Sequence, residues 1–229
     1  MQHSIELAVL DISGTTVKDK GEITAAFAKA FTVKGHTIPE EKIAAVMGYK
    51  KTDAIQRLLE EFAEDKSVIS KEYIDEIHRH FIDDLVNYYK NSGELEAMPY
   101  AEELFKFLKS NNIKVGLDTG FFSNITNVII DRLDWLKNGQ IDFVISSDEA
   151  TAGRPHPYMI QELMKRANVS DSKKVIKVGD TAVDIKEGRS AECLLTIAVT
   201  TGKSYTREQL ELYQPDYIID SLQELPSLL

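Results

Sequence analysis

Residues 7–16 of the chain, LAVLDISGTT, decide the fold. Four apolar residues in succession predict a buried strand, and this run ends at Asp11. Gly14 and the two threonines after it predict a turn directly beyond the strand. A carboxylate at the end of a buried strand is costly unless a cation or a hydrogen-bond donor meets it. Asp11 is therefore a candidate functional residue.

Five further apolar runs predict that this strand belongs to a parallel sheet. The runs lack the alternation of a half-exposed strand, which is typical of strands buried on both faces. Strands that alternate with amphipathic helices favour an α/β fold, here a three-layer Rossmann-like parallel sheet core. The predicted strands are residues 5–10, 113–117, 141–145, 175–178, 194–199 and 217–219, and the intervening helices include residues 100–110, 123–136 and 158–167.

The segment between the first two strands breaks this alternation. It holds four predicted helices and no convincing strand, at residues 25–33, 40–47, 52–62 and 70–89. A helical insertion after the first strand predicts a cap subdomain of residues 17–97 on a core of residues 1–16 and 98–229. Gly and Pro residues near the ends of the insertion predict hinges at residues 17–21 and 92–99.

Composition excludes several classes of function. The chain has 229 residues, of which 43% are apolar and 28% charged, as is typical of a soluble globular enzyme. Its net charge of −10 and the lack of a basic stripe argue against a nucleic-acid partner. No apolar run approaches the ~18 residues of a membrane span, so we expect no membrane association and a cytoplasmic protein. The single cysteine, Cys193, rules out an internal disulfide and predicts a small core residue.

Polar residues follow the predicted strands where a ligand would bind. Ligands of open α/β sheets lie beyond the carboxyl ends of the strands. The oxygen groups and the cation found there suit Mg²⁺ and a phosphate, because Mg²⁺ prefers oxygen ligands and arginine pairs with phosphoryl oxygens. These residues are Asp11, Asp118, Thr119, Gly120, Asp180, Thr181 and Asp184, with Arg154 opening a helix before the strand at 175–178.

Taken singly, each of these residues has a structural explanation. Asp180 would cap a helix at residues 181–188, and Asp148 would cap the turn after residue 145. Thr119 alone is more typical of a turn hydroxyl, and Arg154 alone is more typical of a surface charge. Their joint occurrence at several strand ends favours a binding site.

These residues resemble the four ordered motifs of the haloacid dehalogenase superfamily. The motifs are Asp11-Ile12-Ser13-Gly14-Thr15, Thr119-Gly120, Arg154-Pro155 and Gly179-Asp180-Thr181-Ala182-Val183-Asp184. The resemblance implies that Asp11 is a nucleophile that forms an aspartyl-phosphate. It implies Mg²⁺ held by Asp11, the Ser13 carbonyl and Asp180, with support from Asp184. Thr119 and Arg154 would bind phosphoryl oxygens, and the cap would close over the substrate.

Within the superfamily, the chain is similar to the phosphonatase (phosphonoacetaldehyde hydrolase) branch. The stretches AGRPHPYMI, IKVGDTAVDIKEGRSA and LDTGF carry this resemblance. The branch has a small residue in place of the second aspartate of the first motif, and Ser13 fits that pattern. A carbon leaving group does not take its proton as an alkoxide does, and the branch uses a cap lysine that forms a Schiff base with an aldehyde. The segment 47–53 resembles its Met-Gly-x-x-Lys-x-Asp pattern and implies that Lys51 is this amine.

Three hypotheses for Lys51 stay open from the residues alone. The amine forms a Schiff base, with its pKa lowered by the like charge of Lys50. Alternatively it pairs with a phosphate as a fixed charge. In the third hypothesis, both lysines cap a solvated helix start. The chain departs from the branch at Ala54, where a histidine is expected, and at Phe121, where a tyrosine is expected, and its cap is shorter.

The leading prediction is a Mg²⁺-dependent hydrolase of a small phosphonate, with a phosphatase for a small phosphomonoester as the alternative. A haloacid dehalogenase and a non-catalytic phosphate binder are further alternatives. The resemblance also implies pairing into a homodimer through the cap, which no feature of the sequence decides. We expect the substrate to be contacted by Ser13, Thr15, Met47, Gly48, Gly120 and Phe121.

Overall fold

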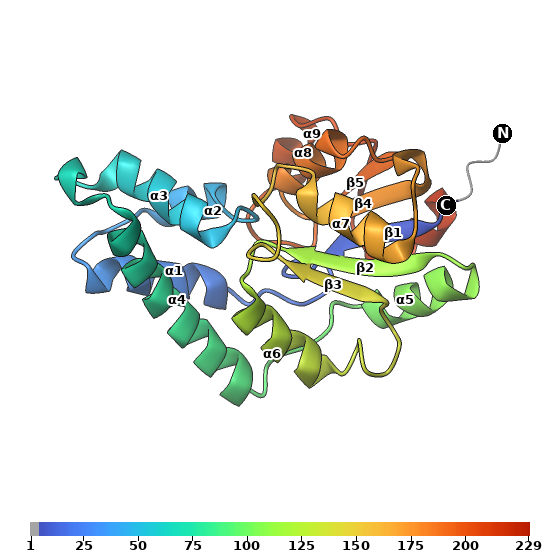
Figure 1. Cartoon of the computed structure of the whole chain (residues 1–229), viewed down its shortest axis with the longest axis horizontal. Coiled ribbons are helices and arrows are strands. Elements are labelled where there is room, and N and C mark those ends of the chain that lie inside the picture. Colours follow the sequence, from blue (N-terminus) through green and yellow to red (C-terminus); the bar gives the residue numbers. More distant parts are fainter. Residues whose placement is uncertain (1–4) are drawn as a thin grey trace.

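Six parallel strands form one sheet in the computed structural model, which describes residues 5–229 (Figure 1). The strand order is β3-β2-β1-β4-β5-β6, so β1 lies in the middle and the chain crosses to either side of it. This order places the ends of β1, β2 and β4 next to one another, as a ligand site requires. The strands are β1 Leu7–Asp11, β2 Lys114–Thr119, β3 Phe143–Ser146, β4 Val175–Gly179, β5 Leu195–Val199 and β6 Tyr217–Ile219.

Helices cover both faces of the sheet and confirm the predicted three-layer Rossmann-like core (Figure 1). Alternate residues of β1 point to opposite faces, because strand side chains alternate. Ala8 and Leu10 pack in the core that also holds α5, whereas Leu7 and Val9 pack against α7. One layer comprises α5 (Ala101–Ser110), α6 (Ser123–Leu133) and η3 (Leu222–Leu228), and the other α7 (Tyr158–Ala167), η2 (Ser172–Lys174), α8 (Ala182–Ser190) and α9 (Arg207–Glu211).

Between β1 and α5 the chain forms a separate group of helices, here called the helical block (Figure 1). It comprises α1 (Glu22–Val33), α2 (Glu40–Ala45), α3 (Lys51–Phe62), η1 (Lys66–Val68) and α4 (Lys71–Asn91). Ser70 caps α4, since its hydroxyl accepts a hydrogen bond from the Tyr73 N–H at 3.2 Å. Inside the block, the Phe27 ring of α1 meets the Phe81 ring of α4 at 4.6 Å, edge to face. Helix α4 also packs against α6, so it joins the block to the sheet layers.

The chain enters and leaves the helical block through two adjacent segments, residues 16–18 and 96–98, here called the paired crossing. Val17 and Ala97 form an antiparallel bridge. The Lys18 N–H donates to the Glu96 carbonyl at 3.1 Å, and the Met98 N–H donates to the Thr16 carbonyl at 2.8 Å. The chain therefore runs between the sheet and the block through one two-stranded connection, which overlaps the segments in which the sequence predicts hinges.

The structure differs from the sequence prediction mainly at the ends of elements. Residues 134–136 were expected in α6, but the helix ends at Leu133 because Asp134 takes a left-handed conformation, with φ 58°. Residues 141–142 precede β3 instead of opening it, and the short α9 was not expected.

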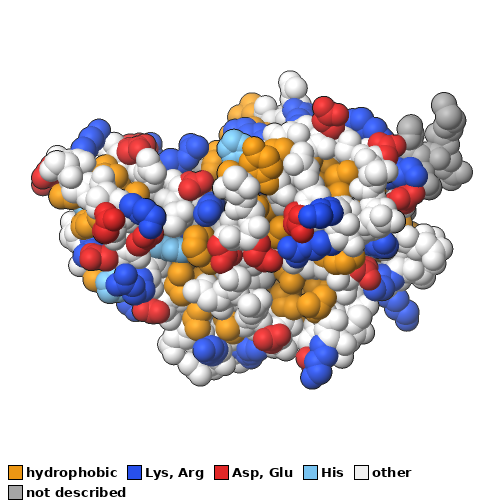
Figure 2. All heavy atoms as spheres, viewed as in Figure 1, with side chains coloured by type: hydrophobic (Ala, Val, Ile, Leu, Met, Phe, Trp, Pro, Cys, Tyr) orange, Lys and Arg blue, Asp and Glu red, His pale blue; other side chains and the backbone are white. Residues whose placement is uncertain are grey.

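Cys193 is buried, as predicted. No helix within residues 5–229 has the length and apolar character to cross a bilayer. Acidic and basic side chains are interspersed over the face shown in Figure 2.

Candidate active site

A cavity lies where the carboxyl ends of the central strands meet the helical block. Asp11 ends β1 and Thr119 ends β2, while Asp180 directly follows β4. Lys51, the first residue of α3, enters from the block. The wall is completed by residues from both sides, namely Ser13, Asp19, Ile23, Met47, Gly48, Gly120, Phe121, Thr181 and Ser204.

The loop between α2 and α3 lies in close contact with the sheet edge at two glycines. Gly48 has φ 83°, and a Cβ atom there would lie 2.3 Å from a methyl carbon of Val183. A Cβ atom on Gly120 would lie 2.5 Å from the Tyr49 carbonyl oxygen. Both positions require glycine because backbone approaches backbone or a packed side chain. The predicted site residues Gly48 and Gly120 therefore set how closely the block approaches the sheet.

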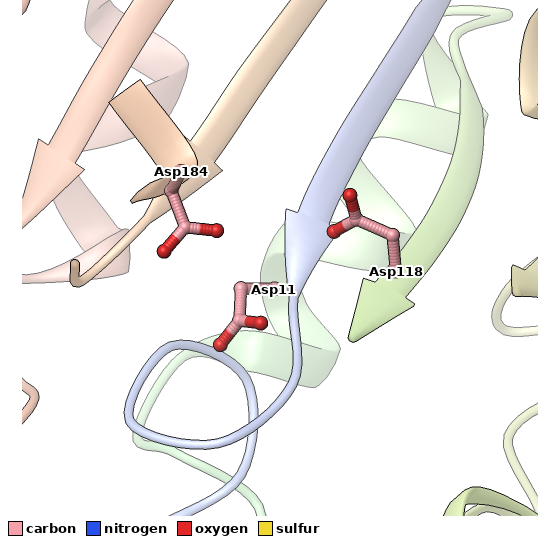
Figure 3. Close-up of side chains that lie close together, drawn as sticks. All are labelled: Asp11, Asp118 and Asp184. Atoms are coloured by element: carbon pink, nitrogen blue, oxygen red, sulfur yellow. The ribbon is translucent and has the colours of Figure 1, made fainter. Parts of the chain in front are cut away.

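Three aspartates converge beneath the cavity, at the end of β1 (Figure 3). Asp11 ends β1, Asp118 comes from β2 and Asp184 comes from the first turn of α8 (Figure 3). One carboxylate oxygen of each lies within 4.8 Å of the others. All three side chains are buried, so their charges require compensation.

Arg154 supplies the first part of that compensation. Its guanidinium is buried and contacts four carboxylates, with Nη1 at 2.6 Å from Asp11 Oδ1 and 3.0 Å from Asp184 Oδ1. Nη2 lies 2.5 Å from Asp118 Oδ1, and Nε lies 3.0 Å from Glu187 Oε2. The planar, forked guanidinium suits this multiple pairing. Arg154 thereby fixes the orientation of the Asp11 carboxylate.

Lys177 supplies the second buried cation. It points from β4 toward α8, where its amine pairs with Asp118, lies 3.1 Å from Asp184 Oδ1 and lies 3.3 Å from Glu187 Oε2. The sequence prediction missed Lys177 and Glu187 as part of the site. The sequence did contain an indication, a lysine inside the apolar run of residues 175–178. A charged side chain in a buried strand requires partners of opposite charge. Glu187 follows Asp184 by three residues on α8, so both side chains share one helix face.

Burial dominates the electrostatics of these carboxyl groups. It raises the pKa of Asp11 to about 6, although Arg154 opposes the shift. Burial and the charge of Asp11 raise the pKa of Asp180 well above its ordinary value. Burial acts in the same direction on Asp118, but Arg154 and Lys177 hold its pKa below the ordinary value. Burial and the neighbouring Asp118 raise the pKa of Glu187 strongly. Arg154 and Lys177 therefore do not fully offset the negative charge of this group of carboxylates.

The donor groups at this site fit a divalent cation. Within residues 5–229, five buried carboxyl groups face only three buried cationic side chains, Lys51, Arg154 and Lys177. Asp118 and Asp184 are already paired with cations. Among the described residues, Asp180 makes no ion pair, and its carboxylate accepts a hydrogen bond from the Thr15 hydroxyl at 3.2 Å. Carboxylate oxygens are ligands that hard divalent metals prefer. The buried aspartates at the end of β1 can therefore bind a metal, and Asp180 adds the least neutralised carboxylate.

Lys51 is buried at the opposite side of the cavity, with 3% of its surface exposed. Its amine lies 5.7 Å and 5.2 Å from the ring centres of Phe27 and Phe121. Burial lowers the pKa of Lys51 to about 8, and the Asp11 charge opposes that shift. The hypothesis of a solvated helix start is wrong for Lys51, because the block encloses its side chain. Burial is also the main cause of the lowered pKa of Lys51, rather than the charge of Lys50 that the sequence suggested. The Lys50 amine lies 5.6 Å from the centre of the Phe122 ring.

Three predicted site residues lie outside the cavity wall. Thr15 is buried and donates to Asp180, while Arg154 and Asp184 lie beneath Asp11.

The structure also shows which residues cap the helices for which Asp180 and Asp148 were candidates. Thr181, not Asp180, caps α8 and forms a capping box with Asp184. Asp148 accepts from the Ser123 N–H at 2.9 Å and so caps α6 rather than its own turn.

Comparison with known proteins shows the family of this chain. Residues 5–192 match the family model of haloacid dehalogenase-like hydrolases. The chain is 29% identical to a phosphonoacetaldehyde hydrolase of Bacteroides fragilis (strain NCTC 9343), over 98% of this chain and 95% of the relative. It is 30% identical to a phosphonoacetaldehyde hydrolase of Bacillus cereus (strain B4264), over 90% of this chain and 81% of the relative.

Solved structures share the fold. A phosphonoacetaldehyde hydrolase-like protein of Oleispira antarctica superposes with a TM-score of 0.85 at 22% identity, over 98% of this chain and 91% of that chain. A hydrolase of Pseudomonas syringae superposes with a TM-score of 0.84 at 18% identity, over 97% of each chain. The chain therefore belongs to the haloacid dehalogenase-like hydrolase family, in the branch that contains the phosphonoacetaldehyde hydrolases.

Proposed function

We propose that this protein is a Mg²⁺-dependent hydrolase of a small phosphonate of the phosphonoacetaldehyde type. Asp11 takes phosphorus from carbon, and Lys51 activates the aldehyde as a Schiff base. One observation carries the proposal: a buried amine with a lowered pKa lines the same cavity as a strand-end aspartate. An amine used as a nucleophile has to lose its proton near neutral pH, and burial promotes that loss.

The phosphorus side of the cavity suits transfer to a carboxylate. Arg154 at 2.6 Å keeps Asp11 in one orientation. The Thr119 hydroxyl accepts a hydrogen bond from the Phe121 N–H at 3.2 Å, which leaves its own hydrogen free to donate to a phosphoryl oxygen. Thr119 and Arg154 would thus orient the phosphoryl group and the nucleophile, respectively.

Mg²⁺ would be held by Asp11, the Ser13 carbonyl and Asp180, with Asp184 in support. The uncompensated carboxylates at this position support such a ligand set. Bound Mg²⁺ would supply positive charge that offsets the phosphoryl oxygens and the carboxylates around them.

Ser13 supports carbon rather than oxygen as the leaving atom. It lies on the cavity wall where a carboxylic acid would protonate a departing alkoxide. In the proposed reaction, the Lys51 amine condenses with the aldehyde to an iminium. Asp11 then attacks phosphorus, and the electron pair of the broken P–C bond moves into the iminium to give an enamine. Protonation of the enamine carbon restores the iminium, and hydrolysis of this iminium and of the aspartyl-phosphate releases the aldehyde without its phosphonate group, together with phosphate.

The helical block would act as the cap, comprising residues 17–97, over a core of residues 1–16 and 98–229, of which residues 1–4 lie outside the described part. Its contacts at Gly48 and Gly120 support a closed position over the cavity. Met47 and Phe121 add apolar side chains to the cavity wall, and closure over the substrate would exclude bulk water while the P–C bond breaks.

A phosphatase for a small phosphomonoester is the second candidate. The charge of Asp11 is the strongest attraction that favours protonation of Lys51. A protonated Lys51 would pair with a phosphoryl group as a fixed cation instead of attacking a carbonyl.

The decisive experiment measures phosphate release with and without Mg²⁺ from phosphonoacetaldehyde, 4-nitrophenyl phosphate and short-chain alkyl phosphates. Asp11→Asn serves as the blank. Lys51→Arg keeps a positive charge but loses the nucleophilic amine. We expect Lys51→Arg to lower phosphonate turnover by at least about 10³-fold and to retain aryl phosphate hydrolysis.

The two candidates give opposite results. Phosphonate turnover that survives Lys51→Arg contradicts the Schiff-base role. Hydrolysis of esters alone by the unmodified protein contradicts the phosphonatase proposal and supports the phosphatase.

A further inference from the structure

One carboxylate on the cavity wall has no role in the proposed reaction. Asp11 and Asp180 are assigned to the nucleophile and the metal, but Asp19 also lines the cavity. It is half-buried and makes no ion pair with any residue from 5 to 229. Among the described residues of the cavity wall, Asp19 is therefore the one carboxylate to which the proposed reaction gives no role.

The local backbone holds Asp19 in one orientation. Its Oδ1 accepts a hydrogen bond from the Gly21 N–H at 2.7 Å, and Gly21 takes φ 100° to close this turn. In the described part of the chain, Oδ2 receives no hydrogen bond, so one oxygen remains free to exchange a proton. The neighbouring Glu22 differs, because its two oxygens accept from the Tyr89 hydroxyl at 2.8 Å and the Lys20 N–H at 2.8 Å.

Asp19 and Lys51 reach the cavity wall from the segment between β1 and α5, whereas Asp11 and Asp180 come from the strand ends. Both side chains line the same enclosed space, and the field of Asp19 favours the protonated form of Lys51. The other ionisable groups that act on Lys51 are Asp11, Asp180 and Arg154, which all lie on the phosphorus side. The charge of Lys51 also lowers the pKa of His78 on α4. His78 does not line the cavity, and its ring packs edge to face on the Phe122 ring, with 4.3 Å between the ring centres.

We propose that Asp19 is the proton-transfer residue for Schiff-base formation at Lys51. This inference rests on the proposed phosphonatase function. Asp19 is a catalytic residue in this role, since it would contact the reacting nitrogen and oxygen atoms.

The proton balance of the step closes without another reactant. The Lys51 ammonium carries three protons, and the iminium formed from it carries one. The two others must reach the carbonyl oxygen, which leaves as water when the C–N double bond forms. Asp19 takes the first proton from nitrogen, passes it to oxygen after C–N bond formation, and then repeats the transfer. It ends the step as a carboxylate, and the positive charge stays on nitrogen.

The test compares a reaction that uses the amine with one that does not. Sodium cyanoborohydride reduces the iminium, so its trapping with phosphonoacetaldehyde is followed as mass gained by the Lys51 peptide. Hydrolysis of 4-nitrophenyl phosphate reports transfer to Asp11 without the amine. The variant is Asp19→Asn, which keeps the hydrogen bond from Gly21. We expect it to slow trapping by about 10²-fold or more relative to its effect on aryl phosphate hydrolysis.

Two further variants complete the design. Asp19→Glu keeps a carboxylate and is expected to restore part of the trapping rate. Asp83→Asn alters an exposed aspartate of α4, and we expect it to leave both rates unchanged. Thermal unfolding of each variant checks that the fold persists.

The outcomes separate failure of the inference from failure of the proposed function. Trapping in Asp19→Asn at the rate of the unmodified protein overturns the inference. A proportional loss of both activities also overturns it, because a merely structural role at the hinge would produce that loss. If Lys51 of the unmodified protein is never trapped while aryl phosphate is hydrolysed, the Schiff-base function itself is wrong, and the inference falls with it.

Discussion

Arg154 organises the buried charges at the scale of single residues. It touches Asp11, Asp118, Asp184 and Glu187, and Lys177 shares the last three. Buried ion pairs of this kind give orientation more reliably than stability, because desolvation offsets most of the attraction. The network thus holds the Asp11 carboxylate in one orientation, and removing one member leaves the charges of the others buried without a partner.

Lys177→Met tests this dependence. The change leaves Asp118 and Glu187 with less positive charge in a buried setting, so we expect the free energy of unfolding to fall by about 3–5 kcal/mol. Urea denaturation measures it. Lys173→Met, at an exposed lysine before β4, is the matched control. Adding Glu187→Gln should recover part of the loss, and a loss no larger than that of the control would contradict the network's role.

The strand-end residues of this site could be predicted from the sequence, whereas the network beneath them could not. Asp11, Thr119 and Asp180 follow apolar runs and line the cavity as a strand-end rule requires. Which atoms Arg154 contacts depends on distances between β1, β2 and α8, and no pattern along one segment encodes these. Asp19 was missed because a hinge residue has no periodicity that assigns it a face.

At the scale of elements, α4 connects the helical block to the sheet layers. It packs on α1 and α3 within the block and on α6 of the core. The helix was predictable over most of its length, since apolar residues recur at helical spacing and Ser70 supplies a cap. Its contact with α6 was not predictable, because packing partners depend on where the paired crossing directs the block.

His78 gives α4 a measurable pH dependence. Burial and the Lys51 charge lower the pKa of His78 from 6.5 to about 4, and Nε2 has no hydrogen-bond partner within the described residues. The unfolded chain binds a proton near pH 6.5 and the folded chain only near pH 4. Protonation of His78 therefore does not reduce the free energy of unfolding above pH 6.5, and this free energy falls as the pH decreases from 6.5 toward 4.

His78→Phe should remove this dependence. We expect the melting temperature of the variant to drop less between pH 7 and pH 5 than that of the unmodified protein. His80→Phe, at an exposed histidine of the same helix, should keep the original drop. Equal slopes in all three proteins would show that His78 does not titrate as its burial demands.

At the scale of the whole molecule, the excess of buried carboxylates links metal binding to pH. The folded pKa of Asp11, about 6, lies above its ordinary value of 3.8. The folded state therefore binds more protons than the unfolded chain between pH 4 and 6, and this group lowers stability as the pH rises through that window. A divalent cation offsets the penalty, and protons compete with it for the same oxygens.

We therefore expect MgCl₂ to raise the melting temperature more at pH 8 than at pH 5. Differential scanning fluorimetry measures both shifts, with KCl at equal ionic strength as the control. Asp180→Asn removes one carboxylate and should reduce the shift at pH 8. Equal shifts at the two pH values would contradict binding at these carboxylates.

The three layers and the inserted helices were predictable from the alternation of buried runs and amphipathic segments. The closeness of the block to the sheet was not. It depends on backbone contacts at Gly48 and Gly120, and glycine is compatible with many conformations, so the sequence alone does not reveal which contact requires it.

The paired crossing has a consequence for how such a molecule can change. Its two segments are hydrogen-bonded neighbours, so everything between them begins and ends at nearly one place. A short hairpin turn could join residues 18 and 96 and leave the strand order of the sheet intact. The helical block could therefore be exchanged as one unit. Recombination between relatives could therefore change the residues that the block contributes to the cavity wall, such as Met47 and Lys51, while the strand-end residues stay the same.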